Sequence, residues 1–557
     1  MSLALPAARA RSSAGFSWPR LSWDRLTLVL LLVVAGLILI TFQDYGITWD
    51  EDVHNWYGVF VLDYYLSGFH DLRALHWLDL FNYGAAFDMT AAALNRFSPF
   101  GVYETRHLLD AFIGLLGIAG AGRLGRALGG PRAGFIAALF LALTPNYYGQ
   151  RFNNPKDIPF AVGMVWAVYH LVRLLPALPR PPASRVAKLG IVTGLTLGVR
   201  VGGLLIFGYL GLLLLLAAFW DGIAARRGAV VARALAVSLW RGLLPALLIA
   251  YPVMLFFWPW AQRAPLAHPL AALATFSHET FPFATLFDGR YVPASDLPWS
   301  YLPVYILLAL PELILLLLAL APVAALAGWR QGRAAPTREK TLGLFLLAFA
   351  ILFPVGYAVA IRAVLFDGMR HFIFVLPLIA VVAALVADLI LDRLARSSLR
   401  GWAYGALAIY GALHISVMVR LHPDEYVYYN SLIGGVRGAE GAFKLDYWAN
   451  SYAEAVHGLA RYLRAEYGAD FMRHDFTVAV CGPPISAAYY FPRNFIFVPE
   501  REAAQFFIAF TKDHCDKALS GTPIYQVTRM GALLSVVLDR RAILAAAPAP
   551  ARLAGGR

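Results

Sequence analysis

Long apolar runs, separated by short polar connections, make up most of the first 420 residues of this chain. A helix needs about 20 mostly apolar residues to cross a lipid bilayer. The 557 residues are 59% hydrophobic and 15% charged, whereas an ordinary soluble domain carries about 25% charged residues. The pattern predicts a polytopic α-helical membrane protein and excludes a disordered chain, a disulfide scaffold and a simple two-domain soluble enzyme.

The apolar runs predict about eleven membrane spans. Two neighbouring runs form one long apolar stretch that is interrupted by glycines and by Arg200, and an arginine that faces lipid is costly. We therefore expect a re-entrant turn or two short helices there. The predicted spans are 26–42, 106–122, 133–149, 158–175, 187–200, 203–220, 242–259, 302–327, 342–361, 372–391 and 402–419.

Arginine and lysine set the predicted orientation. They concentrate in every second connection, beginning with the N-terminal segment 1–25, and such connections stay on the cytoplasmic side. The outer side then receives the loops 43–105 and 260–300 and the segment from 420 onward. The net charge of +13, from 47 basic and 34 acidic residues, therefore reports topology and gives no reason to expect a nucleic-acid partner. The lipids that surround the spans are the expected partners.

The segment 420–544 is much less apolar and predicts a small α/β domain outside the membrane. An Ala/Pro-rich end, 545–557, predicts a disordered tail. Cys481 and Cys515, the two cysteines of the chain, either form a disulfide outside the cytoplasm or stay unpaired, and the sequence favours neither. Strand-like runs lie at 476–481, 495–498, 524–529 and 533–539, and helical patterns lie at 451–467 and 500–512.

Acidic side chains at the outer ends of the predicted spans are the first candidates for chemistry. Asp50 and Glu51 follow the first span, and Asp157 directly precedes the fourth. One interpretation is a solvated acidic loop, but the flanking Trp49 and Trp56 favour a cluster held at the membrane interface. A carboxylate is a general base when it reaches the proton that it removes, so two such loops would form a reaction site if they converged.

Basic residues on the same side form the complementary set. Arg106 begins the second span, Lys156 borders the second outer turn, Arg200 interrupts the long apolar stretch, and Arg370 precedes the tenth span. Each of them either extends to lipid headgroups or contributes to a phosphate site, which guanidinium groups bind with several donors. Arg106 and Arg370 are the preferred phosphate ligands, because each precedes an apolar helix on the side of the carboxylates.

At these residues the chain resembles the GT-C membrane glycosyltransferases, in the bacterial branch of protein O-mannosyltransferases and lipid A aminoarabinose transferases. The resemblance covers roughly 26–430, the GT-C-like transmembrane domain being 26–419, and it rests on the order of several short motifs. The motifs include the Asp50-Glu51 pair and the Arg370-His-Phe helix start. The order Asp-Glu-x-x-His looks like the Asp-Glu-Val-His of the mannosyltransferases with one residue inserted, which adds His54 to the set of candidate substrate-binding residues.

The resemblance implies transfer of one sugar from a polyprenyl-phosphate carrier to an acceptor, with inversion, at the periplasmic face of a bacterial inner membrane. Asp50 would be the general base, Glu51 and Asp157 would position the acceptor, and Arg106 and Arg370 would hold the departing phosphate. Lys156, Arg200 and His54 would be further substrate- or phosphate-binding residues. The sequence requires no cofactor and leaves a divalent metal open. It does not select among a lipid, a protein or a polysaccharide as acceptor.

Two other classes of function stay open at this point. A transporter or flippase for a lipid-linked glycan would share the many spans and the charges near the membrane. Against it, no inverted repeat is visible and the acids gather at one face rather than at the midplane. A non-catalytic GT-C scaffold whose outer domain binds a partner is the second alternative. An enzyme is the leading expectation.

Overall fold

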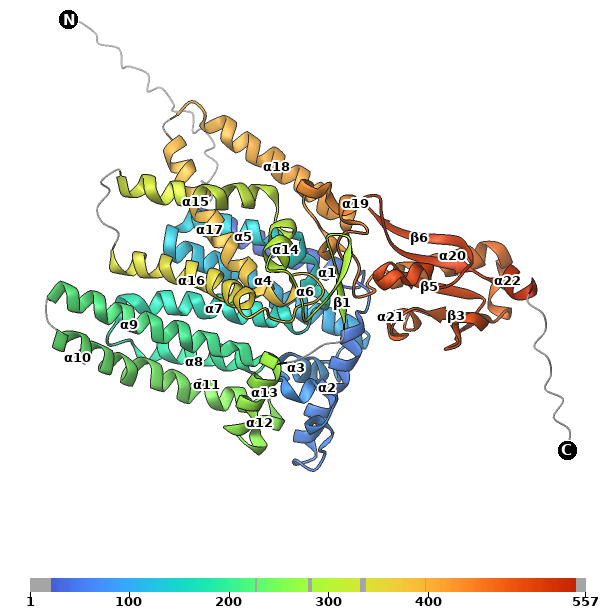
Figure 1. Cartoon of the computed structure of the whole chain (residues 1–557), viewed down its shortest axis with the longest axis horizontal. Helices are drawn as coiled ribbons and strands as arrows, with labels where there is room; N and C mark the ends of the chain where they lie inside the picture. The colour runs from blue at the N-terminus through green and yellow to red at the C-terminus, as the bar shows by residue number, and fades with distance from the viewer. Residues whose placement is uncertain (1–21, 226–227, 279–282, 331–336, 396, 547–557) are drawn as a thin grey trace, which may run out of the picture.

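A computed structural model of the chain describes residues 22–225, 228–278, 283–330, 337–395 and 397–546. Most of the predicted N-terminal segment 1–25 and of the predicted tail 545–557 lies outside these residues. Long helices that run side by side form a bundle, and a smaller α/β unit lies at one end of it (Figure 1).

Within the described residues, eight helical segments are long and apolar enough to cross a membrane, or nine if one bent pair counts as a span. The chain is therefore a mostly helical, multi-pass membrane protein. The eight segments contain α1 (Trp23–Thr41), α4 (Val102–Gly129), α7 (Asp157–Leu174), α9 (Leu205–Ala225), α10 and α11 (Gly228–Ser238 and Leu244–Phe256), α16 (Arg338–Ala360), α17 (Leu376–Leu394) and α18 (Arg400–Leu421).

The predicted count of about eleven spans is not confirmed, because three of the predicted runs are broken or short. The run 133–149 divides into α5 (Pro131–Ala142) and α6 (Pro145–Asn153), since Pro145 begins a new helix. The run 187–200 is the 15-residue α8 (Ala183–Leu197), which ends before Arg200. The run 302–327 forms α14 (Tyr301–Ala309) and α15 (Glu312–Arg330), which meet at an angle of 117°. Leu310, at the bend, is extended as expected for the residue before a proline.

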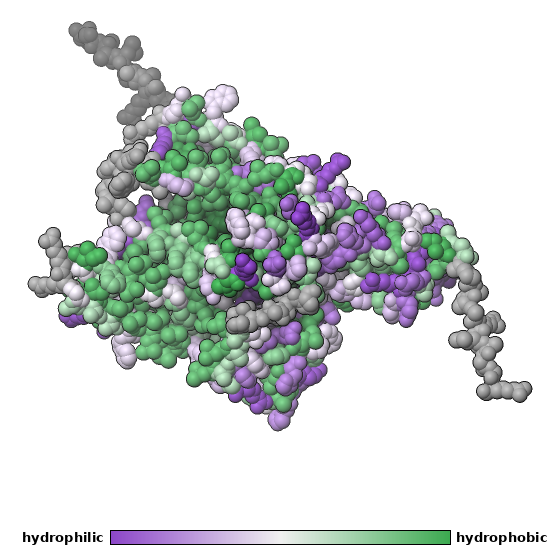
Figure 2. Space-filling view, in the orientation of Figure 1, coloured by the Kyte–Doolittle hydropathy of each residue, from purple (hydrophilic) through white to green (hydrophobic). Residues whose placement is uncertain are grey.

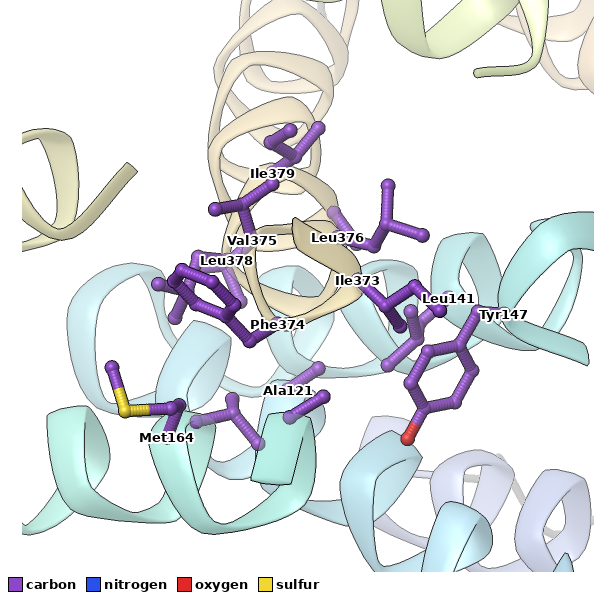
Figure 3. Close-up of a cluster of buried hydrophobic side chains, with 14 of the residues drawn as sticks. Ala121, Leu141, Tyr147, Met164, Ile373, Phe374, Val375, Leu376, Leu378 and Ile379 are labelled. Atoms are coloured by element: carbon purple, nitrogen blue, oxygen red, sulfur yellow. The ribbon is translucent and has the colours of Figure 1, made fainter. Parts of the chain in front are cut away.

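The main core lies where α4, α5 and α7 meet α17. Ala121 of α4, Leu141 of α5 and Met164 of α7 gather around the segment from Ile373 to Ile379 (Figure 3). The 3-10 turn η6 (Arg370–Val375) leads directly into α17. Of the 18 most apolar consecutive residues in η6 and α17, 72% are buried inside the protein. Because η6 begins at Arg370, the packing of the core fixes a charged side chain at the edge of the bundle.

Apolar side chains cover the outside of the bundle, whereas polar side chains are frequent over the C-terminal unit (Figure 2). In α1 and in α18, only 11% of the 18 most apolar consecutive residues are buried inside the protein. Exposing this much apolar surface is unfavourable in water and favourable in the hydrocarbon of a bilayer. The surface thus agrees with a bundle that is surrounded by lipid.

The C-terminal unit packs α20 (Tyr452–Tyr467) against a sheet of five strands, in the order β4-β3-β5-β7-β6. The pairs β3–β4 and β3–β5 are parallel, and the pairs β5–β7 and β6–β7 are antiparallel. The strands are β3 (Phe476–Val480), β4 (Phe495–Phe497), β5 (Phe506–Phe510), β6 (Thr522–Arg529) and β7 (Ala532–Asp539).

The helix expected at 500–512 is wrong. Its apolar half is the central strand β5, in which every residue is buried. A short apolar run fits a buried strand as well as a buried helix, and only the neighbouring strands decide between them. Beyond β5, the segment η11 (Lys512–Lys517) is joined to the end of β3 by a disulfide between Cys481 and Cys515, whose Cα atoms are 6.2 Å apart.

Three segments that the sequence places on one side of the membrane meet at the same end of the bundle (Figure 1). They are the loop that contains α2 (Trp49–Leu66) and α3 (Ala86–Asn95), the hairpin of β1 (Ala284–Phe287) and β2 (Arg290–Pro293), and the C-terminal unit. The ring centroids of Trp49 and Phe510 are 6.4 Å apart, and those of Tyr291 and His514 are 5.3 Å apart. The loop 260–300 also contains α12 (Pro259–Arg263) and α13 (Ala267–His278).

Candidate active site

The first turn of α2 contains two neighbouring acids with different surroundings. Asp50 is partly exposed, and Glu51 caps the start of the helix. The Glu51 carboxylate accepts a hydrogen bond of 2.8 Å from the backbone N–H of Thr48, which forms a capping box, and it lies 3.1 Å from Nε2 of His107. The Glu51 side chain is 1% exposed, whereas the Asp50 side chain is 32% exposed. Asp50 is therefore the accessible acid of this pair, a distinction that the sequence did not make.

Arg370 connects the acids of three separate segments. Its Nη2 lies 3.2 Å from Oδ2 of Asp50, its Nη1 lies 3.6 Å from Oδ2 of Asp367, and its Nε lies 3.9 Å from Oδ2 of Asp157. The guanidinium carbon lies 5.1 Å from the ring centroid of Trp448. A buried guanidinium requires such partners, because an unpaired buried charge is strongly unfavourable. Arg370 thus brings together Asp50 and Asp157, two acids whose convergence the sequence left open.

The predicted residues Asp157, Arg200 and Lys156 lie beside Arg370. Oδ1 of Asp157 is 2.6 Å from Nη1 of Arg200, and the Asp157 side chain is 3% exposed. Nζ of Lys156 lies 4.5 Å from the ring centroid of Tyr83. Desolvation and the neighbouring charge of Arg200 lower the pKa of Lys156 to about 8. Asp157 is held between two arginines, so it balances their charge and is not itself accessible.

Electrostatics keep Asp50 ionised. Desolvation alone would raise the pKa of its carboxyl group, but the charges of Arg370, Lys156 and His54 outweigh this effect and lower the pKa below its ordinary value. At neutral pH the side chain is therefore a carboxylate that can accept a proton from a neighbouring hydroxyl group.

A second charged cluster, sealed from solvent, lies along α2 behind the first. Nδ1 of His54 is 2.8 Å from Oδ2 of Asp88, and Nη2 of Arg106 donates a hydrogen bond of 2.6 Å to Oδ1 of Asp88. The exposed fractions of these side chains are 5%, 5% and 1% for His54, Asp88 and Arg106. Arg106, which the sequence suggested as a phosphate ligand, is buried here and donates to Asp88. Asp88 was missed, although it is the one charged residue of α3.

Two further lysines, which the sequence analysis also missed, extend the chain of ion pairs around Arg370. Nζ of Lys444 donates a hydrogen bond of 3.0 Å to Oδ1 of Asp367, and Nζ of Lys512 lies 3.8 Å from the same oxygen. Nζ of Lys512 also lies 3.6 Å from the ring centroid of Trp49. Lys512 belongs to the C-terminal unit, so no local pattern in the sequence could have placed it at the end of α2.

The ionic groups around Arg370 carry an excess of positive charge. Five basic and three acidic side chains give a net charge of 5 − 3 = +2 for the set. Such an excess attracts anions, and guanidinium and ammonium groups are the usual ligands of phosphate. The set consists of Arg200, Arg370, Lys156, Lys444 and Lys512 with Asp50, Asp157 and Asp367.

The carboxylates of this set do not fit a divalent metal. The position between Asp50, Asp157 and Asp367 is taken by the guanidinium group of Arg370. Across the part of the chain that the structure describes, no group of three or more His, Cys, Asp or Glu side chains is arranged to hold a metal ion.

The sequence matches no protein-family model and no curated protein. Among solved structures, the chain is similar to ArnT from Cupriavidus metallidurans bound to undecaprenyl phosphate, with a TM-score of 0.48 and 15% identity over 92% of this chain and 98% of that one. It is also similar to the oligosaccharyltransferase of Archaeoglobus fulgidus in the apo form, with a TM-score of 0.44 and 12% identity over 83% of this chain and 63% of that one. Both neighbours are GT-C fold glycosyltransferases.

Proposed function

We propose that this protein is a membrane glycosyltransferase, which transfers a sugar from a polyprenyl-phosphate donor to a hydroxyl group of an acceptor. The observation that carries the proposal is the accessible, ionised Asp50 beside the cations Arg370, Arg200 and Lys156. Transfer of a sugar from a lipid phosphate needs a base for the acceptor hydroxyl and a cationic site for the departing phosphate. Both lie within one cluster at the end of a helical bundle.

In the proposed reaction, the acceptor oxygen attacks the anomeric carbon of the sugar while the bond from that carbon to the phosphate oxygen breaks. The acceptor proton passes to a carboxylate oxygen of Asp50, and the electron pair of the breaking bond leaves with the polyprenyl phosphate. Attack from the side opposite the leaving group inverts the anomeric carbon. The departing phosphate gains negative charge, and one preorganised donor contributes about 3–4 kcal/mol to stabilising such a charge.

The other residues of the cluster support these two groups. Arg370 holds Asp50 in place and supplies positive charge for the phosphate, while Asp157 and Arg200 fix the orientation of Arg370. Lys156 adds positive charge close to Asp50. For Glu51, His54 and Arg106 we propose structural roles in place of the roles first expected for them, because Glu51 caps α2 and the other two side chains bind Asp88.

We place the site at the periplasmic face of a bacterial inner membrane, with the N-terminus in the cytoplasm. Two independent features support this orientation. Arginine and lysine concentrate in the connections at the opposite end of the helices. The disulfide between Cys481 and Cys515 lies in the C-terminal unit, on the side of the site, and disulfides persist in oxidising compartments.

The test is release of polyprenyl phosphate by the purified protein, supplied with a polyprenyl-phosphate sugar and a panel of lipid, peptide and glycan acceptors. Asp50→Asn should lower kcat by about 10³-fold, because general base catalysis contributes about 10²–10⁴-fold. Asp52→Asn is the matched control and should stay near the wild-type rate. Asp52 lies two residues beyond Asp50 in α2, so it faces another side of the helix, where it accepts a hydrogen bond from Tyr103. Transfer by Asp50→Asn at the wild-type rate would contradict the assignment of the base. Movement of the lipid across the membrane without sugar transfer would favour a flippase.

A further inference from the structure

The C-terminal unit completes a cavity beside the proposed reaction site. The cavity has a volume of about 630 Å³, and its walls come from α2, the β1–β2 hairpin, the loop before η6 and the start of η11. Its lining includes Trp49, Tyr291, Phe366, Asp367, Lys444 and Lys512. Trp49 precedes Asp50 in the chain, and Arg370 contacts both Asp50 and Asp367. A ligand in this cavity would therefore lie next to the proposed base.

The polar wall of the cavity contains more buried positive than negative charge. Lys444, Lys512 and Arg370 all converge on one carboxylate, that of Asp367. Desolvation would raise the pKa of Asp367, but the charges of Lys512 and Lys444 lead those that lower it to about 2. Asp513, the other acid of the lining, is exposed. Two lysines of the lining, Lys444 and Lys512, share the buried carboxylate of Asp367, which also contacts Arg370, so the wall is suited to a second anion.

Much of the remaining lining is aromatic. Trp49, Tyr291, Phe283 and Phe366 lie around the lysines, and Tyr291 packs against His514 of the C-terminal unit. A concave site with a mostly apolar and aromatic lining and a few convergent charges is typical of small-molecule binding. Aromatic rings offer flat faces to the C–H groups of a sugar ring, and the cations select a ligand that also carries negative charge.

The segment that carries Lys512 is held in an unfavourable conformation. Asp513 and His514 both have left-handed φ angles, of 52° and 59°, which residues other than glycine seldom adopt. Cys515 follows at once and is bonded to Cys481 at the end of β3. Strained residues of this kind persist where the surrounding structure maintains them, and they cluster at ligand sites. Here the disulfide and the contact of His514 with Tyr291 both lie within three residues of Lys512.

We propose that this cavity binds a saccharide that carries a carboxylate or a phosphate, with Lys512 and Lys444 as ligands of the anionic group and Trp49 as the platform for the ring. Lys512 makes the C-terminal unit a determinant of specificity. The identification of this saccharide as the acceptor rests on the proposed function, because only the acceptor must place a hydroxyl group beside Asp50. The binding site itself does not depend on that function.

Binding is measured by calorimetry on the full-length protein in phosphatidylcholine nanodiscs, with glucose, glucose 6-phosphate and glucuronate as probes. At least one charged sugar should bind about tenfold or more tightly than glucose, because charge-assisted hydrogen bonds are the strong ones. Lys512→Met should weaken binding of the charged sugar about tenfold, and Lys512→Arg should retain most of it. Lys517→Met is the matched control, since Lys517 is an exposed lysine of the same segment and lies outside the lining. Equal affinity for all three sugars, or equal losses in Lys512→Met and Lys517→Met, would overturn the proposal.

A transfer assay separates this proposal from the proposed function. Lys512→Met should raise KM for an anionic acceptor about tenfold and leave kcat within about threefold, whereas Asp50→Asn should lower kcat. Lys444→Met provides a second variant if Lys512→Met does not fold. Binding of charged sugars without any transfer would overturn the glycosyltransferase and keep the binding site. Transfer with a KM that ignores both the charge of the acceptor and Lys512 would overturn the binding site and keep the glycosyltransferase.

Discussion

Two clusters, each of which pairs an acid with an arginine, include residues of α2. They have similar composition but differ in how accessible the acid is to solvent. In one, Asp50 pairs with Arg370, and its side chain is 32% exposed. In the other, Asp88 pairs with Arg106 and His54, and its side chain is 5% exposed. In both clusters the charges of the partners outweigh desolvation and lower the pKa of the acid. An acid with an arginine partner is therefore not a reaction site by itself, and access to a substrate makes the difference.

The two clusters are neighbours because each contains a residue from the same face of α2. Asp50 and His54 are four residues apart, so they lie on the same face of α2. The charge of His54 contributes to the lowered pKa of Asp50, while the ring of His54 is held by Asp88. We infer that the sealed cluster anchors the helix and that the open cluster carries out the chemistry. Each of the following experiments can break this division of roles.

Among these experiments, Arg370→Gln should have the largest effect. The substitution removes the cation that three carboxylates share and the charge proposed to stabilise the phosphate, so kcat should fall about 10²–10³-fold. Arg370→Lys should recover only part of this loss, because one ammonium group does not replace a planar guanidinium with several donors. The measurement is release of polyprenyl phosphate. A rate within threefold of wild type in Arg370→Gln would show that the open cluster is not the phosphate site.

A change in the sealed cluster should act on stability instead. Asp88→Asn leaves Arg106 buried without its counter-charge, and breaking a buried pair costs about 3–5 kcal/mol. The measurement is the free energy of unfolding in detergent, with Asp71→Asn as control. Asp71 pairs with Arg73 at the surface, where a pair contributes at most about 1 kcal/mol. Loss of kcat in Asp88→Asn at unchanged stability would instead give the sealed cluster a part in the chemistry.

The smallest expected effect is on the pH dependence. Because the pKa of Asp50 lies below its ordinary value, kcat should stay level from neutral pH down to about pH 5 and fall only as the pH drops through that lowered pKa. Ionised Asp50 also stabilises the fold above its unfolded pKa, and this contribution is lost as the pH falls through the folded pKa. Arg370→Gln removes the strongest of the lowering charges, so the acid limb should move to higher pH. A limb already present at pH 6 in the wild type would point to a different base.

The sequence was informative about the helices and less so about where they break. Apolar runs identified the long helices because lipid requires an apolar surface over a whole span. Proline divides two of the predicted runs, 133–149 and 302–327. The bend of 117° at Pro311 could not be predicted from the number of apolar residues. In the C-terminal unit, the buried strand Phe506–Phe510 was mistaken for part of a helix, because burial on both faces removes the alternation that marks a strand.

The candidate site was predictable where its residues stand at helix ends. Asp50, Asp157 and Arg370 each adjoin an apolar run, and their positions placed them on the same side of the membrane without showing that they meet. Asp367 and Lys512 could not be found in this way, because they meet only after the C-terminal unit has docked on the bundle. The sequence also could not show that Asp50 is more exposed than Glu51. Glu51 is buried because its side chain forms the capping box with Thr48, and that contact exists only in the folded helix.

The bond between Cys481 and Cys515 also imposes an order on the biosynthesis of this protein. Thiols stay reduced in the cytoplasm, so this pair can close only after the C-terminal unit has been translocated, under the topology proposed above. Until then, the segment η11, which begins with Lys512, lacks its covalent link to the end of β3. A newly synthesised chain would therefore be inserted in the membrane before the wall that carries Lys512 is cross-linked, and oxidation would follow translocation.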